Sequence, residues 1–108
     1  LKHGPIALID KSMPLVALNP WSKVFEKTLS NLEEVKARRG KIILFTDKKG
    51  KELSKDLTKS IFQLPSCSDF LTPILYSLPL QLIAYYTALD KGTDVDQPRN
   101  LAKSVTVE

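Results

Sequence analysis

The chain has 108 residues, of which 43% are hydrophobic and 26% are charged, and its formal net charge is +4 at pH 7. This composition is too balanced for a disordered segment and too poor in glycine for a fibrous protein, so it indicates a soluble globular chain. A chain of this size can build one core but not two domains with a deep cleft between them. Because the first residue is Leu1 rather than methionine, we expect the chain to be a piece of a longer protein.

Three short apolar runs in the first two-thirds of the chain are candidates for buried β-strands. They are residues 14–18, residues 41–46 and, more weakly, residues 60–64. Continuous rather than alternating hydrophobicity is typical of parallel strands that are covered on both faces. Residues 6–9 fit either a short strand or a helical turn, and the pattern does not decide between them.

An amphipathic helix is predicted between the first two runs. Asn19 supplies a cap, Pro20 suits the first helical position, and Gly40 is expected to end the helix. The apolar stripe at helical spacing between them is formed by Phe25, Leu29 and Leu32. Strand, helix and strand with short links make a βαβ unit, so the predicted fold class is α/β, with a parallel sheet flanked by helices.

The stretch from Phe70 to Leu89 contains no charged residue and predicts a helix, bent near Pro79 and ending at Gly92. Its many polar side chains and the lack of a basic flank argue against a membrane span. We therefore expect a helix buried inside protein, covered partly by sequence outside this chain or by another subunit. The residues after it are predicted to form an irregular tail.

Basic residues outnumber acidic ones between Lys36 and Lys59. Such a cluster could bind phosphates, but no aromatic residue is interleaved with it as base stacking would require, so a solvated lysine-rich surface is the preferred interpretation. Within the cluster, residues 47–59 are predicted to be a polar connection with a turn at residues 48–50.

Most enzyme signatures are absent from the sequence: it has no glycine-rich phosphate loop, no Cys/His cluster at metal spacing and no nucleophile elbow, so no metal or cofactor is predicted. Cys67 is the one cysteine and is interpreted as a small apolar filler near a helix start. His3 could act as an acid or base near neutral pH. Lys103 could act as a nucleophile only inside a desolvating cleft, because the attacking amine must be uncharged.

Four segments carry a resemblance to a known family. They are residues 1–10 (LKHGPIALID), residues 31–38 (NLEEVKAR), residues 79–85 (PLQLIAY) and residues 91–108 (KGTDVDQPRNLAKSVTVE). Together they resemble the glutamine-dependent fructose-6-phosphate aminotransferases, or glucosamine-6-phosphate synthases. The resemblance spans essentially the whole chain, with residues 48–68 the loosest stretch.

The resemblance implies a glutaminase domain followed by two sugar isomerase (SIS) domains, which deliver ammonia from glutamine to fructose 6-phosphate and give glucosamine 6-phosphate. This chain would be part of the second SIS domain, with residues 1–92 in a flavodoxin-like fold and residues 93–108 as a tail that closes over the sugar site. Lys103 would form an imine with the sugar ketone, and the backbone of Ala102 would line the sugar site. His3 would assist ring opening in the site of a neighbouring subunit.

The same resemblance implies a homodimer that binds a sugar phosphate. The single cysteine favours a reducing compartment, so we expect a cytoplasmic protein, and the composition argues against a nucleic-acid or membrane partner. The resemblance also places the glutaminase cysteine, the phosphate-binding loop and a proton-transferring glutamate outside this chain, so we expect the 108 residues alone to be inactive. A non-catalytic SIS module that senses a sugar phosphate is an alternative, but a sensor has no need for Lys103. Nucleic-acid binding through the basic cluster is another, and it predicts an affinity that falls steeply with salt.

Overall fold

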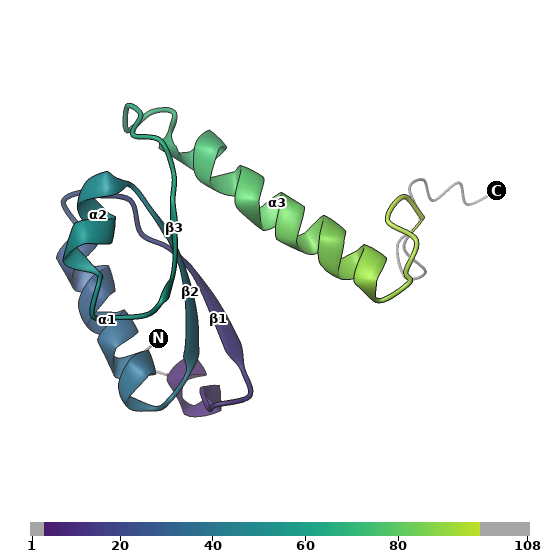
Figure 1. Ribbon diagram of the computed structural model, residues 1–108, viewed down its shortest axis with the longest axis horizontal. Helices are drawn as coiled ribbons and strands as arrows, with labels where there is room; N and C mark the ends of the chain where they lie inside the picture. Colours follow the sequence, from purple (N-terminus) through teal and green to yellow (C-terminus); the bar gives the residue numbers. More distant parts are fainter. Residues whose placement is uncertain (1–3, 98–108) are drawn as a thin grey trace. The chain divides into compact units, whose positions relative to one another are not determined.

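The computed structural model describes residues 4–97 of the chain. The chain forms two compact units, residues 1–72 and residues 73–108. Within the described range the elements are, in chain order, the 3-10 helix η1 (Pro5–Leu8), β1 (Pro14–Leu18), α1 (Phe25–Ala37), β2 (Lys41–Thr46), α2 (Lys48–Leu53), β3 (Ser60–Gln63) and α3 (Thr72–Asp90) (Figure 1). Residues 6–9, whose sequence fits either a short strand or a helical turn, therefore lie mainly in the helical turn η1.

The sheet of the first unit is parallel, with the strand order β1-β2-β3. In its register Val16 pairs with Ile43, and Phe45 pairs with Phe62. The three predicted strands are confirmed, β1 and β2 with the predicted bounds and β3 one residue shorter. The predicted α/β class with a parallel sheet flanked by helices is confirmed as well.

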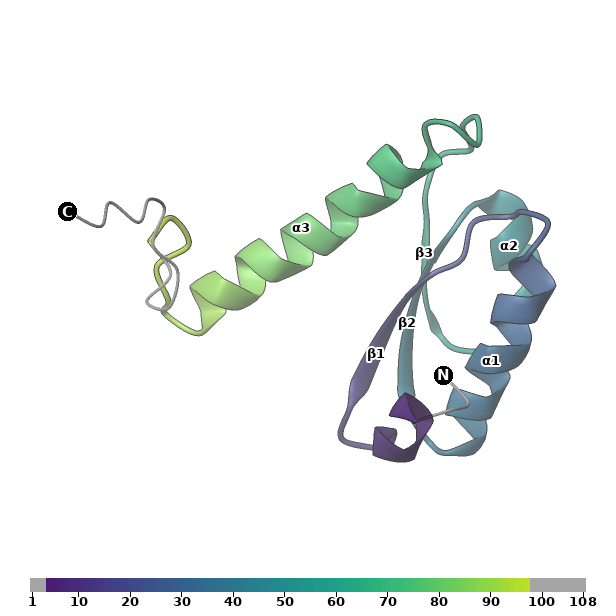
Figure 2. The ribbon, with the colours of Figure 1, turned by 180° about the vertical axis from the view of Figure 1, so that it is seen from behind.

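Helices α1 and α2 lie on the same face of this sheet (Figure 1 and Figure 2), and the core of the first unit lies between them and the strands. The side chains of Phe25, Val35 and Leu44 are fully buried there. Burying a side chain of this size stabilises a fold by about 1.5 to 3 kcal/mol. The predicted apolar stripe of α1 is thus the face that packs on the sheet.

The opposite face of the sheet is also apolar. Side chains alternate along a strand, so Phe45 points away from the face that carries Leu44. The Phe45 ring stacks on Phe62 of the neighbouring strand, with the ring centroids 5.1 Å apart. Val16 and Phe62 are exposed on this face.

Helix α1 begins later than predicted, at Phe25, and no side-chain hydrogen bond caps it. Asn19 does not cap the helix because it is committed to the sheet edge: its backbone N–H donates to the Phe45 carbonyl (3.0 Å), and its Nδ2 donates to the Phe25 carbonyl (3.2 Å). Residues 21–24 form bends and a turn between strand and helix. The predicted cap at Asn19 and helix start at Pro20 are therefore wrong.

The carboxyl end of α1 also differs from the prediction, because the residue in the left-handed region is Arg39 (φ 64°) and not Gly40. The Arg39 N–H donates to the Lys36 carbonyl (2.8 Å) and the Gly40 N–H to the Val35 carbonyl (3.1 Å), which is the Schellman pattern. Gly40 is needed for a different reason. A Cβ atom there would lie 2.7 Å from the side chains of Val35 and Ile9.

The predicted polar connection over residues 47–59 contains a helix that was not predicted, α2. Asp47 caps it, since its Oδ1 accepts from the Gly50 N–H (2.8 Å). Gly50, predicted to lie in a turn, is buried inside this helix, where a Cβ atom would overlap Thr46 Oγ1 and lie 2.9 Å from the Phe25 ring. Glycine at this position lets α2 pack closely on β2 and α1.

The second unit consists of most of α3 and the residues that follow it, described up to Gln97. Helix α3 is a single helix with Pro79 in its interior, and the bend predicted near Pro79 stays a prediction (Figure 1). Gly92 follows the helix in the left-handed region (φ 65°), as predicted. Most of its apolar side chains, including Ile74 and Leu82, are exposed. Their cover by parts outside this chain stays a prediction.

Candidate functional site

The carboxyl ends of parallel strands are where ligands most often bind in this fold class, so the edge formed by the ends of β1 and β2 is the first candidate. Two polar residues there, Asn19 and Thr46, are buried. Thr46 Oγ1 donates to the Asn19 carbonyl (2.6 Å), and Asn19 makes the two hydrogen bonds that tie it to β2 and α1. These groups hold the strand ends together.

Asp47 completes this network. One carboxylate oxygen accepts from the Gly50 N–H of α2 and the other from the Trp21 N–H (3.0 Å), so Asp47 joins the β1–α1 connection to α2. The Trp21 ring lies against the Phe25 ring, with the ring centroids 5.2 Å apart. The Lys49 ammonium group lies over the Trp21 ring, 3.7 Å from its centroid. The polar groups at this edge of the sheet therefore form hydrogen bonds within the protein, which indicates that Asn19, Thr46 and Asp47 have a structural role.

The basic cluster between Lys36 and Lys59 is a second candidate. Its basic side chains are exposed, as the interpretation of a solvated surface predicted. Lys36 Nζ donates to the Asp56 carbonyl, and Lys49 stacks on Trp21. Trp21 thus brings an aromatic ring to the cluster, although it is distant from these lysines in the sequence.

The described residues offer little for redox or metal chemistry. Between residues 4 and 97, no group of three or more His, Cys, Asp and Glu side chains could hold a metal ion. Cys67 is a free, exposed thiol with its sulfur 3.5 Å from Thr72 Oγ1, at the start of α3. Its interpretation as an apolar filler is wrong, because its side chain is exposed, although its place near a helix start is confirmed.

The three predicted site residues, His3, Ala102 and Lys103, lie outside the described residues. The structure describes instead how the chain continues from His3. Gly4 starts the η1 turn, whose Ile6 is buried, and Ile9 packs against the core of the first unit. The segment that follows His3 is thus anchored to the start of the sheet.

Asp10 closes the connection from η1 to β1. Its Oδ1 accepts from the Ser12 hydroxyl (2.6 Å), the Ser12 N–H (2.7 Å) and the Met13 N–H (3.2 Å). These hydrogen bonds, that of the Ser12 hydroxyl foremost, lower the pKa of the Asp10 carboxyl. The ionised Asp10 carboxylate therefore closes this turn through its three hydrogen bonds.

The approach to Ala102 and Lys103 from α3 is also ordered by local hydrogen bonds. The Gly92 N–H donates to the Leu89 carbonyl and the Thr93 N–H to the Ala88 carbonyl, both at 2.9 Å. This is the same Schellman pattern as at the end of α1, here with glycine in the left-handed position. The chain therefore leaves α3 through a fixed turn.

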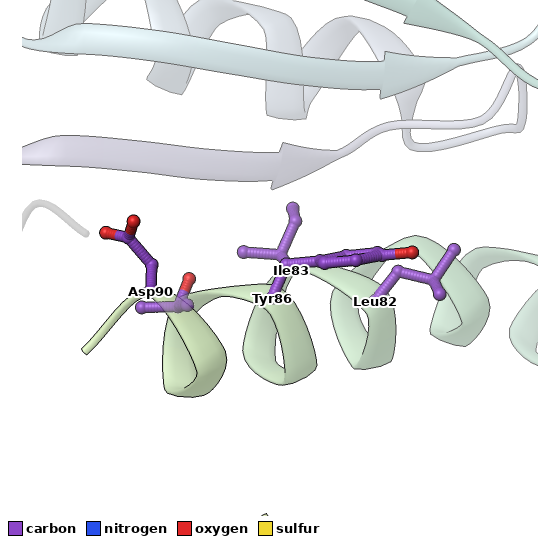
Figure 3. Close-up of a pocket in the computed structure, with 5 residues that line it drawn as sticks. Leu82, Ile83, Tyr86 and Asp90 are labelled. Carbon is purple, nitrogen blue, oxygen red and sulfur yellow. The ribbon is translucent and has the colours of Figure 1, made fainter. Parts of the chain in front are cut away.

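An apolar groove lies along α3 itself (Figure 3). It is lined by Leu82, Ile83, Tyr86, Thr87 and Asp90, and the Tyr86 side chain lies between those of Leu82 and Asp90. Asp90 is the one charged residue of this lining, so the groove has little chemistry to offer a sugar phosphate. No helix between residues 4 and 97 is long and apolar enough to cross a membrane.

The fold and the comparison with known families agree. Residues 1–91 match the SIS domain family. The chain therefore belongs to the SIS domain family, whose parallel sheet with flanking helices is the fold described above.

Curated relatives extend the match through the last residue. The chain is 59% identical over 108 residues to the glutamine–fructose-6-phosphate aminotransferase [isomerizing] of Bartonella quintana, and 57% identical over the same length to the protein of that name from Brucella abortus. In both cases the match covers 100% of this chain and 18% of the relative. The chain thus spans less than a fifth of the length of these relatives.

A solved structure gives the same assignment. The carboxyl-terminal domain of glucosamine-fructose-6-phosphate aminotransferase from Francisella tularensis superposes with a TM-score of 0.82 at 51% sequence identity. The match covers 88% of this chain and 27% of that one.

Proposed function

We propose that this chain is the carboxyl-terminal part of the second SIS domain of a glutamine–fructose-6-phosphate aminotransferase, a transaminase that makes glucosamine 6-phosphate. The observation that carries the proposal is the identity of 57–59% to relatives of that name over all 108 residues. The match includes the tail that contains Lys103, which a sugar-phosphate sensor would not need. The alternative of a sensing module is therefore the weaker one.

In this proposal Lys103 is the catalytic nucleophile. Its uncharged Nζ attacks the ketone carbon of open-chain fructose 6-phosphate, and loss of water leaves an imine. Ammonia released from glutamine then replaces the lysine on that carbon, which frees the amine. A proton shift between the two neighbouring sugar carbons completes glucosamine 6-phosphate.

The other two site residues support this chemistry. His3 moves a proton during opening of the sugar ring, in the site of a neighbouring subunit, and the backbone of Ala102 lines the sugar. Closure of the tail over the sugar excludes water and supplies the desolvated surroundings that an uncharged lysine requires. The tail is thus a part of the site as well as its cover.

The longer protein would be a cytoplasmic homodimer with a glutaminase domain in the same chain. The requirement for His3 from a neighbour supports the dimer, and the free thiol of Cys67 is typical of a reducing compartment. Because the glutaminase, the phosphate-binding loop and the proton-transferring glutamate would lie outside these 108 residues, we expect no conversion of fructose 6-phosphate by the chain alone.

The test is the variant Lys103→Arg in the longer protein. Arginine keeps the positive charge but cannot form the imine, so we expect formation of glucosamine 6-phosphate to fall below about 0.1% of the wild-type rate. The matched control is Lys91→Arg, which alters an exposed lysine just after α3 and is expected to leave the rate unchanged. A Lys103→Arg protein that keeps more than about a tenth of the rate would contradict the proposal and favour a sensing module.

A further inference from the structure

A cavity of about 350 Å³ opens at the amino ends of β2 and β3, the edge of the sheet opposite to the strand ends described above. A volume of this size suits a small molecule. The polar lining consists of Lys41 at the start of β2, Ser60 at the start of β3, and Thr58 and Lys59 just before Ser60. None of the described residues that line the cavity is acidic. The charged side chains of this lining are therefore all positive.

The Thr58 side chain holds the starts of these two strands together. Its hydroxyl donates to the Ile42 carbonyl (2.8 Å) and accepts from the Ser60 N–H (3.2 Å). Ser60 enters the sheet beside β2, and neighbouring strands lie about 5 Å apart. The backbone of Lys59, the residue before Ser60, is therefore held close to that of Lys41.

Neither of these two lysines is neutralised within the part of the chain that the structure describes. Both side chains are exposed, and neither Lys41 nor Lys59 makes an ion pair or a side-chain hydrogen bond with a residue between 4 and 97. Lys36 and Lys49 of the same basic cluster, by contrast, contact a backbone carbonyl and an aromatic ring. Two ammonium groups on adjacent strands repel each other, and an anion between them removes that repulsion.

We propose that this cavity binds a small phosphate monoester, with the phosphate group between the ammonium groups of Lys41 and Lys59. A phosphate monoester carries about two negative charges at neutral pH and so matches two ammonium groups, whereas a carboxylate carries one. The Ser60 hydroxyl, which makes no hydrogen bond among the described residues, is a further donor in the lining. The apolar part of the ester lies against Pro14 and Ile43, which also line the cavity.

The experiment is lysine footprinting of the longer protein. Exposed lysines are acetylated with acetic anhydride in the presence and in the absence of phenyl phosphate, and the acetylation of each lysine is quantified in peptides by mass spectrometry. Sodium chloride matches the ionic strength, so that general screening acts equally in both samples. Lys48 and Lys51, two exposed lysines of α2 that do not line the cavity, are the internal controls.

At about 10 mM phenyl phosphate we expect acetylation of Lys41 and Lys59 to slow by about 5-fold, which corresponds to a dissociation constant of about 2.5 mM. Acetylation of Lys48 and Lys51 is expected to change by less than about 1.5-fold. Unchanged acetylation of Lys41 and Lys59, or equal protection of all four lysines, would overturn the inference. Slow acetylation of Lys41 and Lys59 without phenyl phosphate would overturn it as well, because another part of the longer protein would then fill the cavity.

The variant Lys41→Gln tests whether the two lysines bind one anion. Removing one ammonium group leaves a single charge for the phosphate, so we expect protection of Lys59 by phenyl phosphate to fall below about 1.5-fold. Lys48→Gln is the matched control, which removes the same charge from α2 and should keep the protection of Lys59 at about 5-fold. A Lys41→Gln protein in which Lys59 is protected as in the wild type would contradict a shared site.

This inference goes beyond the proposed function and uses none of its site residues. The footprint is measured at Lys41 and Lys59, which take no part in the proposed sugar chemistry. Loss of activity in Lys103→Arg and protection of these two lysines can therefore each be observed without the other, so the failure of one proposal is distinguishable from the failure of the other.

Discussion

The two compact units of the chain treat their apolar side chains in opposite ways. In the first unit, Phe25, Val35 and Leu44 are fully buried between the sheet and its helices. In the second, α3 is the more apolar helix, yet Ile74 is 62% exposed and Leu82 55% exposed. An apolar sequence therefore indicates that a segment must pack against other residues. In the first unit the βαβ connectivity brings those residues together within the chain.

The largest expected effect comes from removing a core side chain of the first unit. Leu44→Ala should lower the free energy of unfolding of the chain by about 3 to 5 kcal/mol, because it leaves a cavity in a close-packed core. Ile74→Ala, the matched truncation on α3, should change it by less than about 0.5 kcal/mol. Urea denaturation of both variants measures the difference. Equal losses of unfolding free energy in Leu44→Ala and Ile74→Ala would contradict the difference between the two units.

A smaller effect is expected at Gly50, where packing and helix propensity oppose each other. Alanine is preferred to glycine in a helix by about 1 kcal/mol, but the added Cβ would overlap Thr46 Oγ1. We expect packing to win and Gly50→Ala to destabilise the first unit by about 1 to 3 kcal/mol. Gly4→Ala is the control, because a Cβ at Gly4 meets no atom within 4 Å. A gain in stability from Gly50→Ala in thermal unfolding would show that α2 packs more loosely.

The smallest effect compares how α1 and α3 end. Both helices use the Schellman pattern, but the left-handed residue is Arg39 after α1 and Gly92 after α3. Arg39→Gly should therefore stabilise the chain by about 0.5 to 1 kcal/mol, and Gly92→Ala should destabilise the end of α3 by about 1 kcal/mol. Chemical denaturation reports the first, and amide hydrogen exchange of residues 88–93 reports the second. The same sign of change for both variants would contradict this account.

The strands and the fold class could be predicted because they depend on short apolar runs and their spacing, which are local properties. The start of α1 could not, because Asn19 is held by hydrogen bonds to Phe45 on the neighbouring strand and to the Phe25 carbonyl, and neither contact is visible in the local sequence. Helix α2 was missed because its lysine-rich sequence has no apolar periodicity. The Asp47 cap, three residues before Gly50, was the signal that could have revealed it.

The candidate site was predicted by resemblance and not by physical pattern. Nothing in the composition around Lys103 distinguishes it from the other lysines, and the surroundings that would activate its amine are tertiary. The structure describes the residues next to the predicted site residues: the segment after His3, which is anchored to the first unit, and the Schellman turn by which the chain leaves α3.

Trapping of the imine at Lys103 tests the central claim most directly. The longer protein is incubated with fructose 6-phosphate in the absence of glutamine, reduced with borohydride and digested, and the peptides are analysed by mass spectrometry. The account predicts a sugar phosphate attached to the peptide that contains Lys103, and its loss in Lys103→Arg. A protein that converts fructose 6-phosphate while the adduct is absent, or lies on another lysine, would contradict it.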